Sequence, residues 1–118
     1  MKNKRFLVSK DFYFDAAHSL PNYNGKCEKL HGHRWRVRVT VWGELDESTG
    51  IAVDFKEIGK TVKNEIIDKV DHTYLNDILE HPSAENIALL FFEKLKNKFN
   101  IHSIEVWETP QNKVTYIP

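Results

Sequence analysis

The chain has 118 residues, with 17 lysines and arginines against 17 aspartates and glutamates, so its formal net charge is zero. That balance gives no electrostatic reason to expect nucleic acid as a partner, and the length predicts one domain over residues 1–118. One cysteine cannot form an internal disulfide, which suits a reducing cytoplasm. We find no apolar run long enough for a membrane span or a signal-peptide core, and therefore expect a cytoplasmic protein without a membrane partner.

The first half of the chain is predicted to form two strands joined by a loop. Residues from about Phe6 to Ala17 are rich in aromatic side chains and predict a strand. Proline, asparagine and glycine residues between Leu20 and Leu30 predict a loop. From His33 to Leu45 large apolar residues alternate with arginine and threonine, which predicts a second strand with one buried face. A turn is expected over Asp46–Gly50, followed by an extended segment from Ile51 to Asp54.

The middle of the chain is predicted to form two helices. Asp54 suits an N-cap, Glu57 is placed to complete a capping box, and apolar residues then recur at helical spacing to Val70. This helix should end near Lys69. The second helix should open at Ser83, since a serine there can cap the first turn.

The end of the chain is predicted to form two more strands. Apolar residues at Ile104–Trp107 and Val114–Ile117 indicate these strands, with the turn between them at Pro110–Asn112. Hairpins that flank two central helices predict an α+β fold in the order ββααββ. We therefore expect a four-stranded antiparallel sheet that carries both helices on one face.

Three histidines and the cysteine of this chain lie close together in the sequence, at His18, Cys27, His31 and His33. If the first two strands pair antiparallel, the end of one meets the start of the other, and the three histidines share one corner. The intervening loop should then fold Cys27 back over the same corner. Three imidazoles without a fourth protein ligand predict a catalytic zinc with an open position. Cys27 is then a candidate acid, base or nucleophile. A structural zinc site with Cys27 as fourth ligand remains an alternative.

Two further positions carry candidate chemistry. His72 follows Asp71, and a histidine paired with a carboxylate can exchange a proton with a thiol. Glu108 ends an apolar strand, where its two oxygens could accept hydrogen bonds from adjacent N–H groups of a ligand. For both positions an ordinary solvated charge remains the alternative. The arginines at alternate positions of the second strand either hold a phosphate chain or form a solvated face; these are Arg34, Arg36 and Arg38.

The segments Phe14–His18 and Cys27–His33 resemble the 6-pyruvoyltetrahydropterin synthase family, in particular its bacterial 6-carboxytetrahydropterin synthase branch of the queuosine pathway. The resemblance continues in order along nearly the whole chain, through Gly43–Asp46, Thr49–Gly50, Val53–Phe55, Asp71–His72, Leu75–Asn76, Pro82–Glu85 and Glu108–Pro110. Ser83 stands where members of the family often carry threonine, and both residues can cap a helix.

This resemblance implies the tunnelling fold, in which subunits join their sheets into a barrel and two such rings stack. It therefore implies a homohexamer, a dimer of trimers, with active sites between subunits. It also implies Zn²⁺ as the cofactor, bound by His18, His31 and His33.

The resemblance further implies a role for each remaining candidate. Cys27 would abstract a proton, Asp71 and His72 would complete a triad from the neighbouring chain, and Glu108 would anchor the pterin. The substrate would be 7,8-dihydroneopterin triphosphate, a small molecule, and the products 6-carboxytetrahydropterin, acetaldehyde and triphosphate. The same fold acting as a 6-pyruvoyltetrahydropterin synthase in biopterin synthesis is the alternative, and the compact chain favours the carboxy branch.

Overall fold

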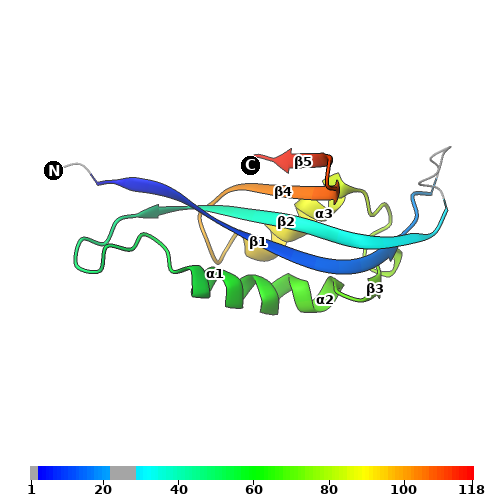
Figure 1. The fold of residues 1–118 in the computed structure, drawn as a ribbon, viewed down its shortest axis with the longest axis horizontal. Coiled ribbons are helices and arrows are strands. Elements are labelled where there is room, and N and C mark those ends of the chain that lie inside the picture. Colours follow the sequence, from blue (N-terminus) through cyan, green and yellow to red (C-terminus); the bar gives the residue numbers. More distant parts are fainter. Residues whose placement is uncertain (1–2, 22–28) are drawn as a thin grey trace.

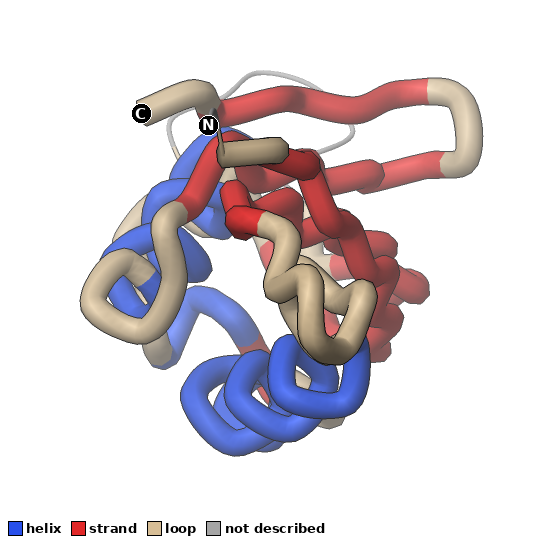
Figure 2. The backbone as a smooth tube through the Cα atoms, turned by 90° about the vertical axis from the view of Figure 1, so that its left-hand side faces the viewer, coloured by secondary structure: helices blue, strands red, loops and turns tan. Residues whose placement is uncertain are grey.

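A computed structural model of the protein describes residues 3–21 and 29–118. A five-stranded sheet in the order β3-β1-β2-β4-β5 forms one layer (Figure 1). Its strands are β1 (Arg5–His18), β2 (His31–Glu44), β3 (Thr73–Tyr74), β4 (Ile101–Thr109) and β5 (Asn112–Tyr116). The helices are α1 (Phe55–Val62), α2 (Asp68–Val70) and α3 (Ala84–Leu95). Figure 2 shows the helices gathered on one side of the strands, as the α+β prediction requires.

The long hairpin of β1 and β2 forms the centre of the sheet. The two strands are antiparallel and pair over their full length, from Arg5 opposite Glu44 to His18 opposite His31. Alternate side chains of β2 enter the core beneath the helices, and all four are fully buried: Trp35, Val37, Val39 and Val41. The predicted alternation is therefore confirmed, and the burial of these residues fixes which face of β2 points toward the helices.

The sheet differs from the prediction in one strand. Four antiparallel strands were expected, but β3 adds a fifth, which runs parallel to β1 and pairs with Ala16 and Ala17. A strand of two residues is too short to produce an alternating pattern, so its sequence carries no strand signal. This strand holds the segment around Asp71 and His72 against the end of β1.

The first predicted helix is confirmed at both ends but is not uniform. Asp54 is its N-cap, and its carboxylate accepts a hydrogen bond from the Lys56 backbone N–H at 2.8 Å. The expected capping box is wrong, because no described hydrogen bond involves the Glu57 side chain. Between α1 and α2 a π-helical turn spans Lys63–Ile67, which lets the adjacent Ile66 and Ile67 both face the core. Periodicity alone does not show such a turn.

The second predicted helix begins where the sequence indicates. The Ser83 hydroxyl accepts a hydrogen bond from the Asn86 backbone N–H at 3.1 Å and so caps α3. The buried side chains of this helix include Ile87, Phe91 and Leu95, which lie against β4 and β5. Among the described residues no helix is both long enough and apolar enough to cross a membrane.

The sheet face away from the helices is charged. Asp11 accepts hydrogen bonds from Arg36 and Arg38, with closest distances of 2.8 and 2.7 Å. The Arg36 guanidinium also lies 4.0 Å from the centre of the Trp107 ring. Arg34 pairs with Asp15 further along the strands. All three arginines of β2 are thus engaged by carboxylates, which favours the solvated strand face over a phosphate site.

We expect the Asp11 contacts to stabilise the fold in a pH-dependent way. The Arg38 hydrogen bond, followed by Arg36, holds the pKa of the Asp11 carboxyl below its usual value near 3.8. A lowered folded-state pKa gives stability that is present above the unfolded value and is lost as the pH falls through the folded value. Asp11→Asn should therefore cost about 1 kcal/mol at pH 7. Urea unfolding should show that the difference in unfolding free energy between the wild type and Asp11→Asn is constant down to pH 5 and narrows below pH 4.

Asp68→Asn is the matched control, because Asp68 pairs with Lys63 at an exposed position. Its effect should be a few tenths of a kcal/mol, roughly the value of an exposed ion pair. An Asp11→Asn effect no larger than this would contradict the stabilising role of the cluster.

Candidate metal centre

Three histidine side chains meet at the end of the β1–β2 hairpin. His18 is the last residue of β1 and lies opposite His31, the first residue of β2, while His33 lies opposite Ala16. All three share the strand face that Trp35 and the rest of the core occupy. The strand pairing expected from connectivity is therefore confirmed, and it brings together the three predicted ligands.

The ring nitrogens of this cluster are arranged for metal binding. The Nε2 atom of His18 lies 3.0 Å from that of His31 and 3.4 Å from that of His33. Each Nδ1 instead faces a backbone carbonyl oxygen, at 2.8 Å for His18 and Pro82, 2.9 Å for His31 and Lys29, and 3.2 Å for His33 and Arg34. Since a carbonyl can only accept, each Nδ1 is placed to donate, and with the proton on Nδ1 the Nε2 lone pairs of the three rings would be directed at one point.

Burial favours the neutral form of His18. Its side chain is 0% exposed, and desolvation lowers the pKa of the imidazole, although the hydrogen bond to Pro82 acts the other way. The neutral ring is the form that binds a metal ion. The donor set thus fits a divalent ion such as zinc, and the converging lone pairs would repel one another without a cation between them.

Trp35 forms the wall behind two of the ligands. Its ring centre lies 4.9 Å from that of His18 and 4.3 Å from that of His33. The indole is fully buried, and its N–H has no hydrogen-bond partner among the residues that the structure describes. The sequence indicates Trp35 as a core residue. Because it follows His33 by two residues on the same strand face, the sequence also indicates that the two rings lie side by side.

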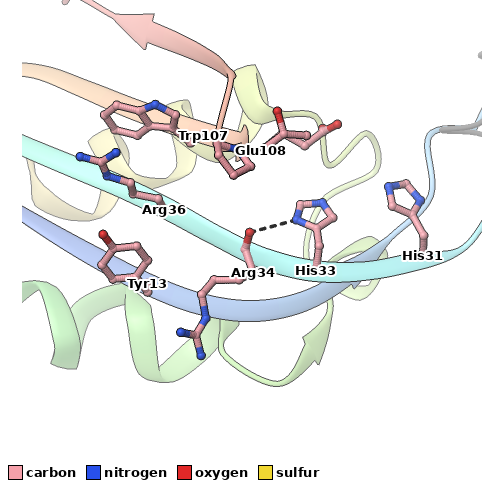
Figure 3. Close-up of a pocket in the computed structure, with 9 residues that line it drawn as sticks. Tyr13, His31, His33, Arg34, Arg36, Trp107 and Glu108 are labelled. Carbon is pink, nitrogen blue, oxygen red and sulfur yellow. Dashed lines mark hydrogen bonds between the residues drawn. The ribbon is translucent and has the colours of Figure 1, made fainter.

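A cavity of about 640 Å³ opens next to the cluster (Figure 3). Its lining residues come from β1, β2, β4 and the turn after β4: Tyr13, His31, His33, Arg34, Arg36, Trp107, Glu108, Thr109 and Pro110. Two of the three ligands therefore face open space, so a small molecule in the cavity can reach a metal ion held by the histidines.

Glu108 lies on the wall of this cavity. It sits near the end of β4, next to Trp107 and across from His33 (Figure 3). No described residue forms a hydrogen bond or an ion pair with its carboxylate. Both oxygens are therefore available to a ligand in the cavity, as the sequence interpretation requires.

Asp71 and His72 form a separate cluster with Asp15, apart from the three histidines. The Asp71 carboxylate accepts the Asp15 backbone N–H at 2.9 Å and lies 3.1 Å from Nδ1 of His72. The first of these contacts, with help from His72, lowers the pKa of Asp71. The His72 side chain is 78% exposed, and its backbone adopts a positive φ of 59°. A single chain therefore brings Asp71 and His72 together, but it does not place them beside the three histidines.

The remaining candidate, Cys27, lies outside the described residues. One group that sequence reasoning missed is the Pro82 carbonyl, which orients His18 from 64 residues away. A backbone carbonyl has no sequence pattern of its own, so only the tertiary structure reveals it.

A family model described as 6-pyruvoyl tetrahydropterin synthase matches residues 7–118. The chain belongs to the 6-pyruvoyl tetrahydropterin synthase family. A relative from Synechocystis, named 6-carboxy-5,6,7,8-tetrahydropterin synthase, is 38% identical over 94% of this chain and 92% of its own length. A relative from Archaeoglobus fulgidus, named as a putative enzyme of the same kind, is 42% identical over 89% of this chain and 90% of its own.

Solved structures of this family confirm the expected fold of the single subunit. The 6-pyruvoyl tetrahydropterin synthase of Caenorhabditis elegans aligns with a TM-score of 0.88 at 28% identity, covering 100% of this chain and 99% of that one. The Plasmodium falciparum enzyme aligns with a TM-score of 0.74 at 24% identity, over 97% and 98% of the two chains. At that lower identity the likeness concerns the fold alone.

The geometry predicts about one zinc ion per chain in the purified protein. His33→Ala removes one of the three lone pairs and should weaken zinc binding at least a hundredfold, since three protein ligands are the usual minimum for such a site. Elemental analysis measures the zinc content per chain, and competition with a chelator measures the zinc affinity. His102→Ala is the control, because His102 lies on β4 outside the cluster and should leave zinc binding unchanged. Full zinc occupancy in His33→Ala would contradict the assignment.

Proposed function

We propose that the protein is a zinc-dependent 6-carboxy-5,6,7,8-tetrahydropterin synthase of queuosine biosynthesis, a single domain over residues 1–118. It would convert 7,8-dihydroneopterin triphosphate and one water to 6-carboxytetrahydropterin, acetaldehyde and triphosphate, which makes it a lyase. The observation that carries the proposal is the convergence of three Nε2 atoms beside a cavity that also contains Glu108. A metal site and a hydrogen-bonding carboxylate at one cavity suit a substrate with hydroxyl groups at one end and a pterin at the other.

The choice of branch within the family rests on the relatives. The Synechocystis and A. fulgidus relatives with 6-carboxy names are 38% and 42% identical to this chain. Relatives named 6-pyruvoyl tetrahydrobiopterin synthase are less similar, at 30% for Drosophila melanogaster and 28% for human.

In this proposal the chain supplies the metal ligands and the pterin anchor. His18, His31 and His33 would hold zinc, which when bound polarises the side-chain oxygens of the substrate and so acidifies the adjacent C–H bond. Trp35 packs on two of these rings and keeps them in place. Glu108 would accept two hydrogen bonds from the adjacent N–H donors of the pterin ring and thereby fix its orientation.

Proton transfer would fall to Cys27 and His72. A thiolate positioned beside the metal cluster can accept the proton of the acidified C–H bond. The low pKa of Asp71 keeps its carboxylate ionised, so it holds the Nδ1–H of His72 and leaves Nε2 to exchange a proton.

The position of the Asp71–His72 pair supports a site shared between subunits. The pair lies outside its own chain's metal cluster, and the His72 ring is exposed. Of the described residues, none pairs with the outer edge of β1 from Arg5 to Phe14 or with the outer edge of β5. Two open edges on one sheet favour closure against identical copies in a ring. We therefore include a homohexamer of two stacked trimers in the proposal, with His72 serving the neighbouring site.

Product analysis tests the proposed reaction. Purified protein incubated with 7,8-dihydroneopterin triphosphate should release acetaldehyde and 6-carboxytetrahydropterin, which mass spectrometry identifies. Triphosphate release with 6-pyruvoyltetrahydropterin and no acetaldehyde would place the protein in the other branch. No conversion by a zinc-loaded protein would refute both.

Cys27→Ala serves as the matched variant in this assay. It should retain zinc and lose about a hundredfold or more in turnover, the usual scale for a positioned acid or base. Loss of zinc in Cys27→Ala would instead indicate a structural site in which the thiolate is the fourth ligand.

Glu108→Gln should weaken pterin binding tenfold to a hundredfold, or about 1.4–2.8 kcal/mol. The substitution keeps the shape of the side chain but replaces one acceptor oxygen with a donor, so one charge-assisted hydrogen bond is lost. Titration with an unreactive pterin analogue measures the change. Zinc content should be unchanged, because Glu108 is not a proposed ligand. Equal affinities for the two proteins would remove Glu108 from the binding site.

A further inference from the structure

The imidazole of His18 is oriented differently from the other two metal ligands. His31 and His33 donate to carbonyls that are two residues and one residue away in the sequence. His18 donates from Nδ1 to the Pro82 carbonyl, 64 residues away. The orientation of His31 and His33 is therefore local, whereas that of His18 depends on where the turn before α3 lies.

Asn86 holds this turn through two hydrogen bonds. Its side-chain NH₂ group donates to the His81 carbonyl at 2.8 Å, and its backbone N–H donates to the Ser83 hydroxyl at 3.1 Å. The same His81 carbonyl also accepts the Ser83 backbone N–H at 2.8 Å. Asn86 therefore contacts the residues on both sides of the buried Pro82.

The direction of the Pro82 carbonyl is tied to the residues on both sides of it. Its C=O group lies in one planar peptide unit with the Ser83 N–H, and that N–H donates to the His81 carbonyl at 2.8 Å. Those neighbours, His81 and Ser83, are the residues that Asn86 binds. Since the group that contacts His18 is a backbone carbonyl, no side-chain substitution removes it directly, and Asn86 is a side chain through which it can be altered.

We propose that Asn86 is a positioning residue of the metal centre. By holding the turn His81–Ser83, it keeps the Pro82 carbonyl on Nδ1 of His18, so that the Nε2 lone pair of His18 points toward His31 and His33. The inference rests on the proposed function insofar as the bound metal is zinc. Its role is distinct from capping α3, because the cap is the Ser83 hydroxyl and the contact that orients the turn is made by the Asn86 side chain.

Asn86→Ala tests the inference with two measurements. Competition with a chelator should show about tenfold weaker zinc binding, at the lower end of the roughly 10–100-fold cost of losing an outer-shell partner. Long-range ¹H–¹⁵N spectra of the zinc-free protein should change from a single Nδ1–H tautomer of His18 to a mixture. The variant should fold, because alanine has a higher helix propensity than asparagine.

Asp54→Ala is the matched control for a general loss of stability. It removes the side-chain cap of α1, remote from the turn, and should leave both the tautomer and zinc binding unchanged. Wild-type behaviour of Asn86→Ala in both measurements, or an equal change in Asp54→Ala, would overturn the inference. Absence of zinc binding in the wild type would refute the proposed function instead, and the tautomer measurement, made without metal, would still decide the role of Asn86.

Discussion

The pairing of β1 with β2 is the constraint on which the candidate metal centre depends. Fourteen residue pairs fix this register, and its last pair is His18 with His31. Because side chains alternate between faces, a slip of one residue would move His18 to the charged face while His31 and His33 stayed on the buried one. The burial of Trp35 and Val37 opposes such a slip, since it would also disturb their packing. The interactions that form the core thus also assemble the three ligands.

The register positions the ligands, and the helical layer orients one of them. His18 is fully buried beneath the turn that leads into α3, and that turn supplies the carbonyl for its Nδ1. Docking of α3 on the sheet therefore places the carbonyl that faces Nδ1 of His18. His31 and His33, which face the cavity, take their carbonyl partners from neighbouring residues of the same segment. The buried ligand is thus tied to the tertiary structure, and the two open to the cavity are held locally.

Alternation and connectivity were sufficient to predict much of this arrangement. The apolar residues of β2 gave its buried face, and antiparallel pairing then placed His18 beside His31 without further information. Three features could not be predicted in this way. The two residues of β3 are too few to show an alternating pattern. The π-helical turn at Lys63–Ile67 leaves the apolar spacing of the sequence looking like that of an ordinary helix. The carbonyl of Pro82 is a backbone group that every residue type carries, so no sequence pattern indicates its role. Each depends on contacts between distant segments, which local patterns do not encode.

The two faces of the sheet divide the candidate chemistry. The metal ligands share the buried face, where desolvation lowers the pKa of the His18 imidazole and so favours its neutral form. The side chain of Asp15 lies on the opposite face of β1 from His18, which is the charged face. The backbone of Asp15 holds Asp71 and His72 beside β3. A single chain therefore forms the metal cluster and the Asp71–His72 pair as two separate sites. If both act on one substrate, a second copy must supply one of them. The outer edges of β1 over Arg5–Phe14 and of β5, which no described residue pairs, are where the sheet can receive it.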